Sequence, residues 1–204
     1  MREKILLIDG HSILNRAFYG LPDLTNSEGL HTNAIYGFLN ILFKMMEEEK
    51  PDYLTVAFDL SAPTFRHKMY DAYKGTRRPM PQELRQQVPV MKDVLGAMGV
   101  PILSMEGYEA DDLLGTIAKR SEAKGMDVTV LSGDRDLLQL ATDHICIRIP
   151  KTKGGKTTIE DYFAKDVQEA YQLSPLQIIE LKALTWSSTC NIQPERRERL
   201  SDRL

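Results

Sequence analysis

The sequence is poor in cysteine and in long hydrophobic runs. Its 204 residues include only two cysteines, Cys146 and Cys190, which are 44 positions apart and form no CxxC or Cys/His pattern. This argues against a disulfide framework or a zinc site, and it favours reduced thiols in a cytoplasmic protein. The N-terminal segment has only four consecutive apolar residues before Asp9. That is too few for a signal peptide or a membrane span, so we expect no membrane partner.

A net positive charge is also lacking. The formal net charge is −3, which argues against a uniformly basic coat for nucleic acid. Any such binding must therefore come from a local patch. The length and the 42% hydrophobic content suit one medium-sized globular domain, or one domain plus an appendage.

Apolar segments of strand length alternate with segments of helical period. The pattern predicts strands at 4–8, 53–58, 127–132 and 144–150, and helices at 32–50, 81–98, within 107–118, and at 136–140, 159–172 and 176–184. A polar turn and a short apolar stretch follow the first strand, Pro89 predicts a kink, and 151–159 predicts a hairpin or loop with Gly154 and Gly155 at its tip. This alternation predicts an α/β fold with a mainly parallel, twisted sheet and helices on both faces.

Acidic side chains follow the ends of four strand-like segments. They are Asp9, Asp59, the triplet Glu109, Asp111 and Asp112, and the pair Asp134 and Asp136. One aspartate after a strand is usually a turn former or a helix cap. The carboxyl ends of parallel strands, however, meet at one edge of a sheet, where ligands bind. We therefore expect up to seven carboxylates in one place.

Carboxylates without histidine or cysteine are hard oxygen ligands, which suit Mg²⁺ or Mn²⁺. Two such ions roughly 4 Å apart can activate a water, hold a phosphate and stabilise the leaving oxygen of a phosphodiester. Glu109 and Asp112 share a helical face, whereas Asp111 points elsewhere if the helix has already begun. Some of these groups are therefore expected to reach metal through water.

A basic segment follows the second strand. Residues 64–78 carry a charge of +4, so the rest of the chain carries −7, and Phe65, Tyr70 and Tyr73 are interleaved with the cations. A run of charge is usually a solvated face. Beside a carboxylate-bearing strand end, this run fits a clamp in which cations neutralise phosphates and aromatic rings stack on unpaired bases.

The quoted motifs ILLIDGHSILNRAFYG, TNAIYGF, TFRHKMYDAYKGTR, GYEADDLLGTIA and LSGDRDLLQL occur in order from about residue 4 to residue 184. In this series the chain resembles the 5′-nuclease domain of bacterial DNA polymerase I, within the flap-endonuclease superfamily with a PIN-like core. The resemblance implies a first divalent ion at Asp9, Asp59, Glu109, Asp111 and Asp112, and a second at Asp134 and Asp136. It also implies DNA contacts, in an arch after the second strand, by Arg66, Tyr73, Lys74, Arg77 and Arg78, with Asn33 as a further contact. Asp9, Asp59, Arg66 and Lys74 are the implied catalytic residues.

The end of the chain departs from the family pattern. Ser187 and Cys190 stand where the family has two aspartates, and an Arg-rich tail over 185–204 replaces the helix-hairpin-helix region. A hydroxyl and a thiol are poor ligands for Mg²⁺, so we expect the second ion to bind weakly. The catalytic core is then expected to span 1–184, and the tail to be weakly ordered or a short peripheral helix.

These features predict a monomeric, Mg²⁺- or Mn²⁺-dependent 5′-3′ exonuclease or flap endonuclease. Its expected partners are DNA with a 5′ single-stranded end or flap and a separate DNA polymerase. The alternative is a catalytically impaired DNA-structure-binding protein on the same fold. An RNA nuclease with a PIN-type core stays open, whereas a phosphatase with an Asp-x-Asp strand end fits poorly, because His11 occupies the second aspartate's position.

Overall fold

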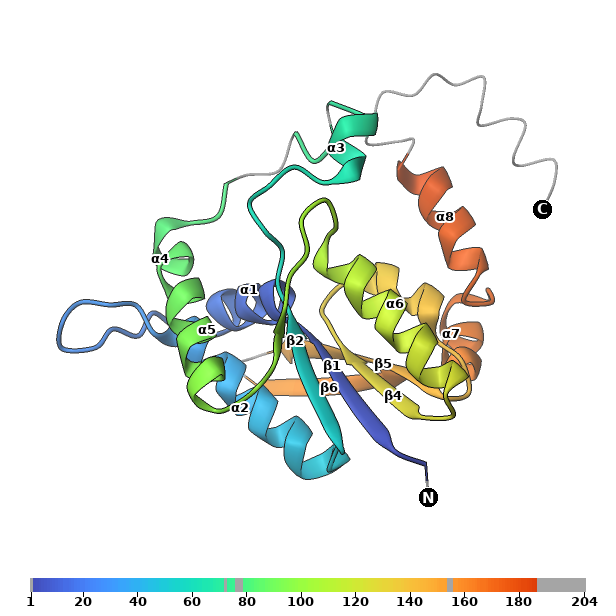
Figure 1. Cartoon of the computed structure of the whole chain (residues 1–204), viewed down its shortest axis with the longest axis horizontal. Coiled ribbons are helices and arrows are strands. Elements are labelled where there is room, and N and C mark those ends of the chain that lie inside the picture. Colours follow the sequence, from blue (N-terminus) through green and yellow to red (C-terminus); the bar gives the residue numbers. More distant parts are fainter. Residues whose placement is uncertain (1, 72, 76–78, 154–155, 187–204) are drawn as a thin grey trace.

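The computed structural model describes residues 2–71, 73–75, 79–153 and 156–186 (Figure 1). Within this part, six strands form one sheet in the order β3-β2-β1-β4-β5-β6. The strands are β1 (Lys4–Asp9), β2 (Tyr53–Ala57), β3 (Ile102–Leu103), β4 (Asp127–Leu131), β5 (Ile145–Lys153) and β6 (Lys156–Tyr162). Every pairing is parallel except that of β5 with β6, so the predicted mainly parallel sheet is confirmed.

Helices cover both faces of the sheet, as Figure 1 shows. One face carries α1 (Gly10–Gly20), α2 (Asn33–Glu49), α4 (Gln82–Arg85) and α5 (Gln87–Ala97). The other carries α6 (Ala110–Ala123), the 3-10 helix η1 (Arg135–Leu140), α7 (Ala164–Tyr171) and α8 (Gln177–Trp186). The short helix α3 (Phe65–Met69) belongs to the segment between β2 and α4. The predicted α/β fold is therefore confirmed.

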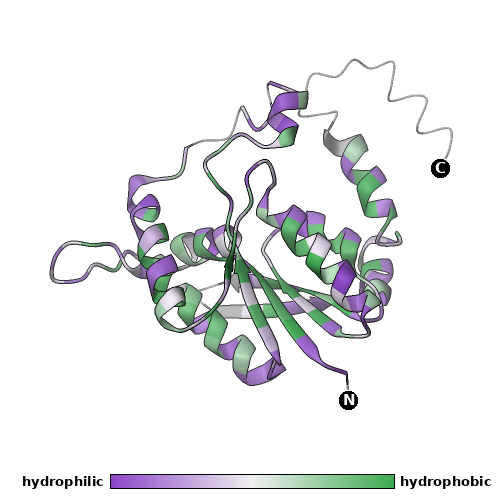
Figure 2. Ribbon diagram, in the orientation of Figure 1, coloured by the Kyte–Doolittle hydropathy of each residue, from purple (hydrophilic) through white to green (hydrophobic). Residues whose placement is uncertain are grey.

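The central strand β1 explains why both faces need a cover. Leu6 and Ile8 belong to the core under α1 and α2, whereas Leu7 between them belongs to the core under α6. All three side chains are fully buried. Side chains alternate across a strand, so a continuous apolar run is typical of a strand buried on both sides. The central strands are accordingly hydrophobic along most of their length in Figure 2.

The chain order reverses beside β1. From β1 the chain moves outward through β2 and β3, and then returns to the other side of β1 with β4 and β5. At such a switch point the loops leaving neighbouring strands diverge and leave a crevice at the carboxyl edge of the sheet. Asp9 and Asp59, with the loop after β4, lie at this edge.

Two element predictions need correction. The polar turn predicted after the first strand is the helix α1, which Asp9 caps by accepting a hydrogen bond from the Ser12 N–H. The predicted helix over 159–172 begins only at Ala164, because residues 159–162 belong to β6 and pair with β5. The hairpin or loop predicted at 151–159 is a hairpin, because β5 and β6 pair antiparallel, and its predicted tip at 154–155 lies outside the described residues.

The kink predicted at Pro89 lies instead at Gln86, where α4 and α5 meet. Pro89 occupies the first turn of α5, where a helix does not need the missing N–H. A proline ring does clash with the carbonyl four residues earlier, so the distortion falls on the N-terminal side of the proline. In the part of the chain that the structure covers, no helix is long and apolar enough to cross a membrane.

Candidate active site

Asp9 is the most firmly held carboxylate at the crevice. Its side chain is 8% exposed and accepts hydrogen bonds from the Ser12 N–H at 3.0 Å and from the Ser132 hydroxyl at 2.8 Å. Ser132 follows β4, so this bond ties the two strands of the switch point together. The adjacent Gly10 is required by packing, since a Cβ there would lie 2.5 Å from the Phe58 ring.

Asp59 follows β2 on the other side of Asp9. Its Oδ1 accepts a 2.7 Å hydrogen bond from the Ala110 N–H at the start of α6. Its own backbone N–H donates to His11 Nδ1 at 3.2 Å. Burial lowers the pKa of His11 against an opposing contribution from Asp59, and Lys92 lowers it further. Asp59 is thus held at its carboxylate by the Ala110 N–H and at its own backbone N–H by the His11 ring.

The triplet at the start of α6, with Glu109 at the N-cap and Asp111 and Asp112 in the first turn, divides into three environments. Glu109 is 5% exposed and accepts hydrogen bonds from Lys74 Nζ at 2.7 Å and from the Tyr73 hydroxyl at 3.1 Å. Asp112 folds back to accept from the Glu109 N–H and also binds both guanidinium nitrogens of Arg66 at 2.7 Å. The Oδ1 atom of Asp111 is buried without a hydrogen-bond partner. The triplet therefore has two roles: Glu109 and Asp112 cap α6, and Glu109 and Asp111 line the cavity.

Asp134 and Asp136 begin η1 after β4. Asp134 caps this helix by accepting from the Asp136 N–H at 2.9 Å, and its own N–H donates to Ser132. Asp136 forms an ion pair of 2.5 Å with Lys182 of α8. The predicted pair therefore separates: Asp134 faces the cavity, and Asp136 faces α8.

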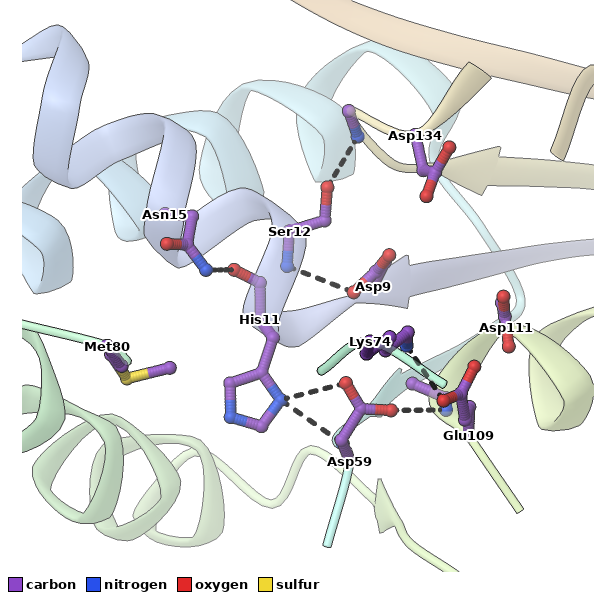
Figure 3. A pocket seen from close by; sticks show the side chains of 12 residues that line it. Asp9, His11, Ser12, Asn15, Asp59, Lys74, Met80, Glu109, Asp111 and Asp134 are labelled. Atoms are coloured by element: carbon purple, nitrogen blue, oxygen red, sulfur yellow. Dashed lines mark hydrogen bonds and ion pairs between the residues drawn. The ribbon is translucent and has the colours of Figure 1, made fainter. Parts of the chain in front are cut away.

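These side chains surround one open cavity of about 590 Å³ (Figure 3). It is lined by Asp9, His11, Ser12, Asn15, Asp59, Lys74, Met80, Glu109, Ala110, Asp111, Gly133 and Asp134. Five of the seven predicted carboxylates, delivered by four separate segments, therefore lie in its wall. Asp112 and Asp136 are held beside it by cations.

Like charge dominates the electrostatics of the cavity. Burial raises the pKa of Asp9 to about 6 against the hydrogen bonds from Ser12 and Ser132, with smaller contributions from the charges of Asp59 and Asp111. Burial also raises the pKa of Asp111, and Asp112 and Glu109 add to the rise. Burial alone would raise the pKa of Asp112 as well, but the hydrogen bonds from Arg66 bring it below its ordinary value. The cavity wall is therefore short of positive charge.

A hard divalent cation fits this wall. The buried, unpartnered oxygen of Asp111 and the raised pKa of Asp9 are both relieved by a positive charge between them. No group of three or more His, Cys, Asp or Glu side chains closes on a common point among the residues that the structure covers. Mg²⁺ commonly keeps several waters and takes only one or two carboxylates directly, so an open ring of carboxylates suits it.

The basic segment leans over the acidic edge. Its first helix, α3, is anchored by the Phe65 N–H, which donates to the Gly107 carbonyl at 2.9 Å. Arg66 binds Asp112, and Tyr73 and Lys74 bind Glu109. The hydrogen bonds with Asp112 raise the pKa of Arg66, whereas burial, followed by the charge of Glu109, raises the pKa of Tyr73. Lys74 adopts a left-handed backbone conformation with φ 56°. Arg77 and Arg78 lie outside the described residues, as do Ser187 and Cys190.

Asn33 does not have the position expected of a DNA contact. It is 2% exposed, donates to the Phe18 carbonyl at 3.1 Å and accepts from Gln87 Nε2 at 3.0 Å. The other end of Gln87 accepts from the Ala34 and Ile35 N–H groups at the start of α2. The structure gives no support to the DNA contact predicted for Asn33, because its buried side chain links α2 to α1 and α5.

Sequence reasoning missed Ser12 and Ser132, which orient Asp9, and gave little weight to His11, which orients Asp59. Ser132 lies directly after a strand and two residues before Asp134, and this position in the sequence could have indicated that it lies at the carboxylate site. His67, the other histidine near the site, accepts from the Thr64 N–H at 3.2 Å in the first turn of α3.

The fold and the cavity together define a class. The α/β sheet with carboxylates at its switch point has the fold of solved flap-endonuclease structures. The crystal structure of the bacteriophage T5 flap endonuclease complexed with DNA and metal ions matches 89% of this chain and 66% of that chain, with a TM-score of 0.68 and 21% identity. The catalytic core of Rad2 complexed with DNA matches 90% of this chain and 55% of that chain, with a TM-score of 0.50 and 17% identity. At these identities the likeness concerns the fold alone.

The particular family follows from the sequence comparisons. The family model described as "5'-3' exonuclease, N-terminal resolvase-like domain" matches residues 4–172, and the chain belongs to this family. The DNA polymerase I of Bacillus subtilis (strain 168) is 48% identical over 191 residues, and that of Bacillus caldotenax 47% over 192 residues. Each alignment covers 94% of this chain and 22% of the polymerase, so the chain spans about a fifth of the length of these relatives.

Proposed function

We propose that this chain hydrolyses phosphodiesters at 5′ ends or flaps of DNA as a divalent-metal-dependent 5′-3′ exonuclease or flap endonuclease. One observation carries the proposal: five carboxylates from four segments line one cavity, and the cations Arg66 and Lys74 pair with Glu109 in its wall. Acidic groups alone would repel a phosphate. The cavity can therefore bind a phosphate only when cations lie between the carboxylates and the phosphate. The relatives are DNA polymerases, which supports DNA as the substrate and a polymerase as the functional partner.

The residues that would hold Mg²⁺ or Mn²⁺ are Asp9, Asp59, Glu109 and Asp111, with Asp134 for a second, weaker ion. When bound, such ions supply an activated water and neutralise charge on the phosphate. Ser12 and Ser132 keep Asp9 aimed into the cavity, and the Ala110 N–H does so for Asp59. Lys74, 2.7 Å from Glu109, is placed to move between this carboxylate and a phosphate oxygen.

A second candidate is a protein that binds 5′ DNA ends without cutting them. Two observations favour it: Ser187 and Cys190 replace two aspartates of the family pattern, and Lys182 already neutralises Asp136. For both reasons, fewer carboxylates are available as ligands for the second ion than for the first. The first candidate stands ahead of this one, because all the carboxylates of the first site are present in the cavity wall or directly beside it.

The two candidates separate in one experiment. A 5′-labelled flap DNA is incubated with the protein in Mg²⁺, in Mn²⁺ and in EDTA, and binding of the same DNA is measured by fluorescence anisotropy. We expect metal-dependent cleavage that falls about 10²- to 10³-fold in Asp9→Asn and in Asp134→Asn, the range typical for loss of one preorganised electrostatic group. DNA affinity should stay within about threefold, because neither aspartate attracts phosphate.

Asp93→Asn on the exposed side of α5 makes the same chemical change away from the cavity and serves as the control. Equal rates in all four proteins would refute the nuclease. Binding with no cleavage by the unchanged protein would establish the second candidate.

A further inference from the structure

The cavity has an uncharged side that the carboxylate chemistry does not use. Asp9, Asp59, Glu109, Asp111 and Asp134 form its acidic side, whereas the remaining wall is made largely by His11, Ser12, Asn15 and Met80. In Figure 3 the His11 ring lies between Asp59 and Met80, at the junction of the two sides. A nucleic-acid strand that meets ions on the acidic side must pass along this second wall.

The geometry of His11 sets its proton on one nitrogen. Nδ1 accepts the backbone N–H of Asp59 at 3.2 Å, so this nitrogen presents its lone pair and the proton resides on Nε2. The ring packs edge-on against Phe58 with centroids 5.3 Å apart, and the side chain is 19% exposed. Nε2 faces the Met80 side of the cavity (Figure 3). His11 therefore holds a fixed, neutral N–H donor over the uncharged wall.

A neutral donor suits this position for an electrostatic reason. A lysine or arginine there would pair with Asp59, as Lys74 pairs with Glu109 and Arg66 with Asp112. Such a pair would compete with the divalent ion for the carboxylate and with the phosphate for the cation. An imidazole N–H binds an oxygen acceptor without supplying a counter-charge to the metal ligands.

We propose that His11 is a substrate-positioning residue of this site. Its Nε2–H donates to a backbone oxygen of the DNA strand on the uncharged side, while its Nδ1 orients Asp59. This inference rests on the proposed function for the identity of the strand, but it concerns binding and does not require cleavage. The acceptor is a non-bridging phosphate oxygen or a sugar oxygen of the same backbone.

Two amide substitutions separate the two ring nitrogens. In His11→Asn the side-chain oxygen can take the place of Nδ1 and keep the Asp59 contact, but nothing replaces Nε2. In His11→Gln the amide N–H reaches the position of Nε2 instead. His144→Asn is the matched control, because His144 Nδ1 lies 3.1 Å from Asp127 at the opposite edge of the sheet.

Binding of a fluorescent 5′-flap DNA is measured by anisotropy in EDTA, and Mn²⁺ affinity is measured by calorimetry without DNA. We expect His11→Asn to bind the flap about tenfold more weakly, the scale of one hydrogen bond to a charged group, with unchanged Mn²⁺ affinity. His11→Gln should recover most of the flap affinity, and His144→Asn should match the unchanged protein. The acceptor is identified with a series of flap DNAs, each of which carries one neutral methylphosphonate at a different position. If a phosphate oxygen is the acceptor, one of these DNAs should bind the unchanged protein and His11→Asn equally well. If a sugar oxygen is the acceptor, every DNA of the series should still bind His11→Asn more weakly.

Unchanged flap binding in His11→Asn would overturn the proposal. So would equal losses in both amide variants together with weaker Mn²⁺ binding, because His11 would then act only through Asp59. Failure of the unchanged protein to bind the flap would refute it as well. Binding without cleavage would refute the nuclease and leave the His11 result standing. A ¹⁵N–¹H long-range NMR spectrum gives an independent check: a proton on Nδ1 contradicts the proposal, and a proton on Nε2 supports it.

Discussion

Beneath the C-terminal end of α2, Arg148 lies among three carboxylates and pairs with each of them. Its guanidinium is 3.1 Å from Glu48, 2.8 Å from Glu49 and 2.9 Å from Asp161, and the side chain is 14% exposed. At the switch-point cavity, Asp9, Asp59 and Asp111 are gathered, and within the described part of the chain the one basic side chain within ion-pair distance of any of them is His11, whose Nδ1 lies 3.6 Å from Asp59. The same residue types are thus compensated in one place and left uncompensated in the other.

The difference separates a structural cluster from a functional one. Burial alone would lower the pKa of Arg148, but Asp161 and Glu49 raise it above its ordinary value, so the charged state fits its surroundings. Burial raises the pKa of Asp9 to about 6, so the charged state of this carboxylate is disfavoured until a cation arrives. The carboxylates around Arg148 are neutralised by a cation of the fold and contribute to its stability. The carboxylates of the cavity are not neutralised and are available to bind a cationic ligand.

Removing the compensating cation should have the largest effect on stability. In Arg148→Ala three carboxylates lose their common partner, and we expect a loss of about 3 to 4 kcal/mol in the free energy of unfolding. Urea denaturation measures this loss, and Arg148→Met, which keeps most of the aliphatic stem, separates charge from packing. The loss should be the same with and without Mg²⁺. A loss below about 1 kcal/mol, typical of exposed ion pairs, would mean that this cluster is not structural.

Removing an uncompensated charge should have the opposite sign. The pKa of Asp9 is raised in the folded protein, so the favourable contribution of this group is complete below about pH 4 and is lost as the pH rises through about 6. Asp9→Asn removes the charge, and the metal-free variant should therefore gain on the unchanged protein over this interval. The gain approaches about 3 kcal/mol above pH 6, less whatever the bonds to Ser12 and Ser132 lose.

Thermal or urea unfolding of both proteins from pH 4 to pH 7 in EDTA measures that difference. Excess Mg²⁺ should stabilise the unchanged protein and have much less effect on Asp9→Asn, because ligands stabilise only the state that binds them. A variant that is less stable at every pH would show that the hydrogen bonds of Asp9 outweigh its charge. Asp9 would then stabilise the fold, as the carboxylates around Arg148 do.

Much of this arrangement could be predicted from the sequence, because it depends on short-range pattern. The apolar run of β1 and the acidic residue after each parallel strand place Asp9 and Asp59 at one edge. The helix α1 was missed because its apolar stretch is short, and residues 159–162 were assigned to a helix because their strand character depends on pairing with β5. Local pattern cannot supply a partner that lies far away in the sequence.

The same limit applies to the partners of each carboxylate. Ser132 binds Asp9 across 123 positions, and Arg66 binds Asp112 across 46. The family pattern placed Asp112 among the metal ligands, and only the fold reveals that a guanidinium already holds it. Asn33 shows the limit most clearly, since its buried side chain accepts a hydrogen bond from Gln87, which is 54 positions away.

The adjacent residues Asp111 and Asp112 show the same contrast between a carboxylate without a cationic partner and one with such a partner. Asp111 has a buried oxygen without a partner, whereas Asp112 is bound by Arg66 through two hydrogen bonds of 2.7 Å. By calorimetry, Asp111→Asn should weaken Mn²⁺ binding by about tenfold or more, and Asp112→Asn by less than about threefold, because Asp111 lines the cavity whereas the carboxylate of Asp112 is bound to Arg66 outside it. Asp112→Asn should instead weaken the hold on Arg66, seen as faster proteolysis of residues 64–78. Equal losses of Mn²⁺ affinity would mean that the Arg66 pair opens when metal binds and that Asp112 belongs with the uncompensated carboxylates.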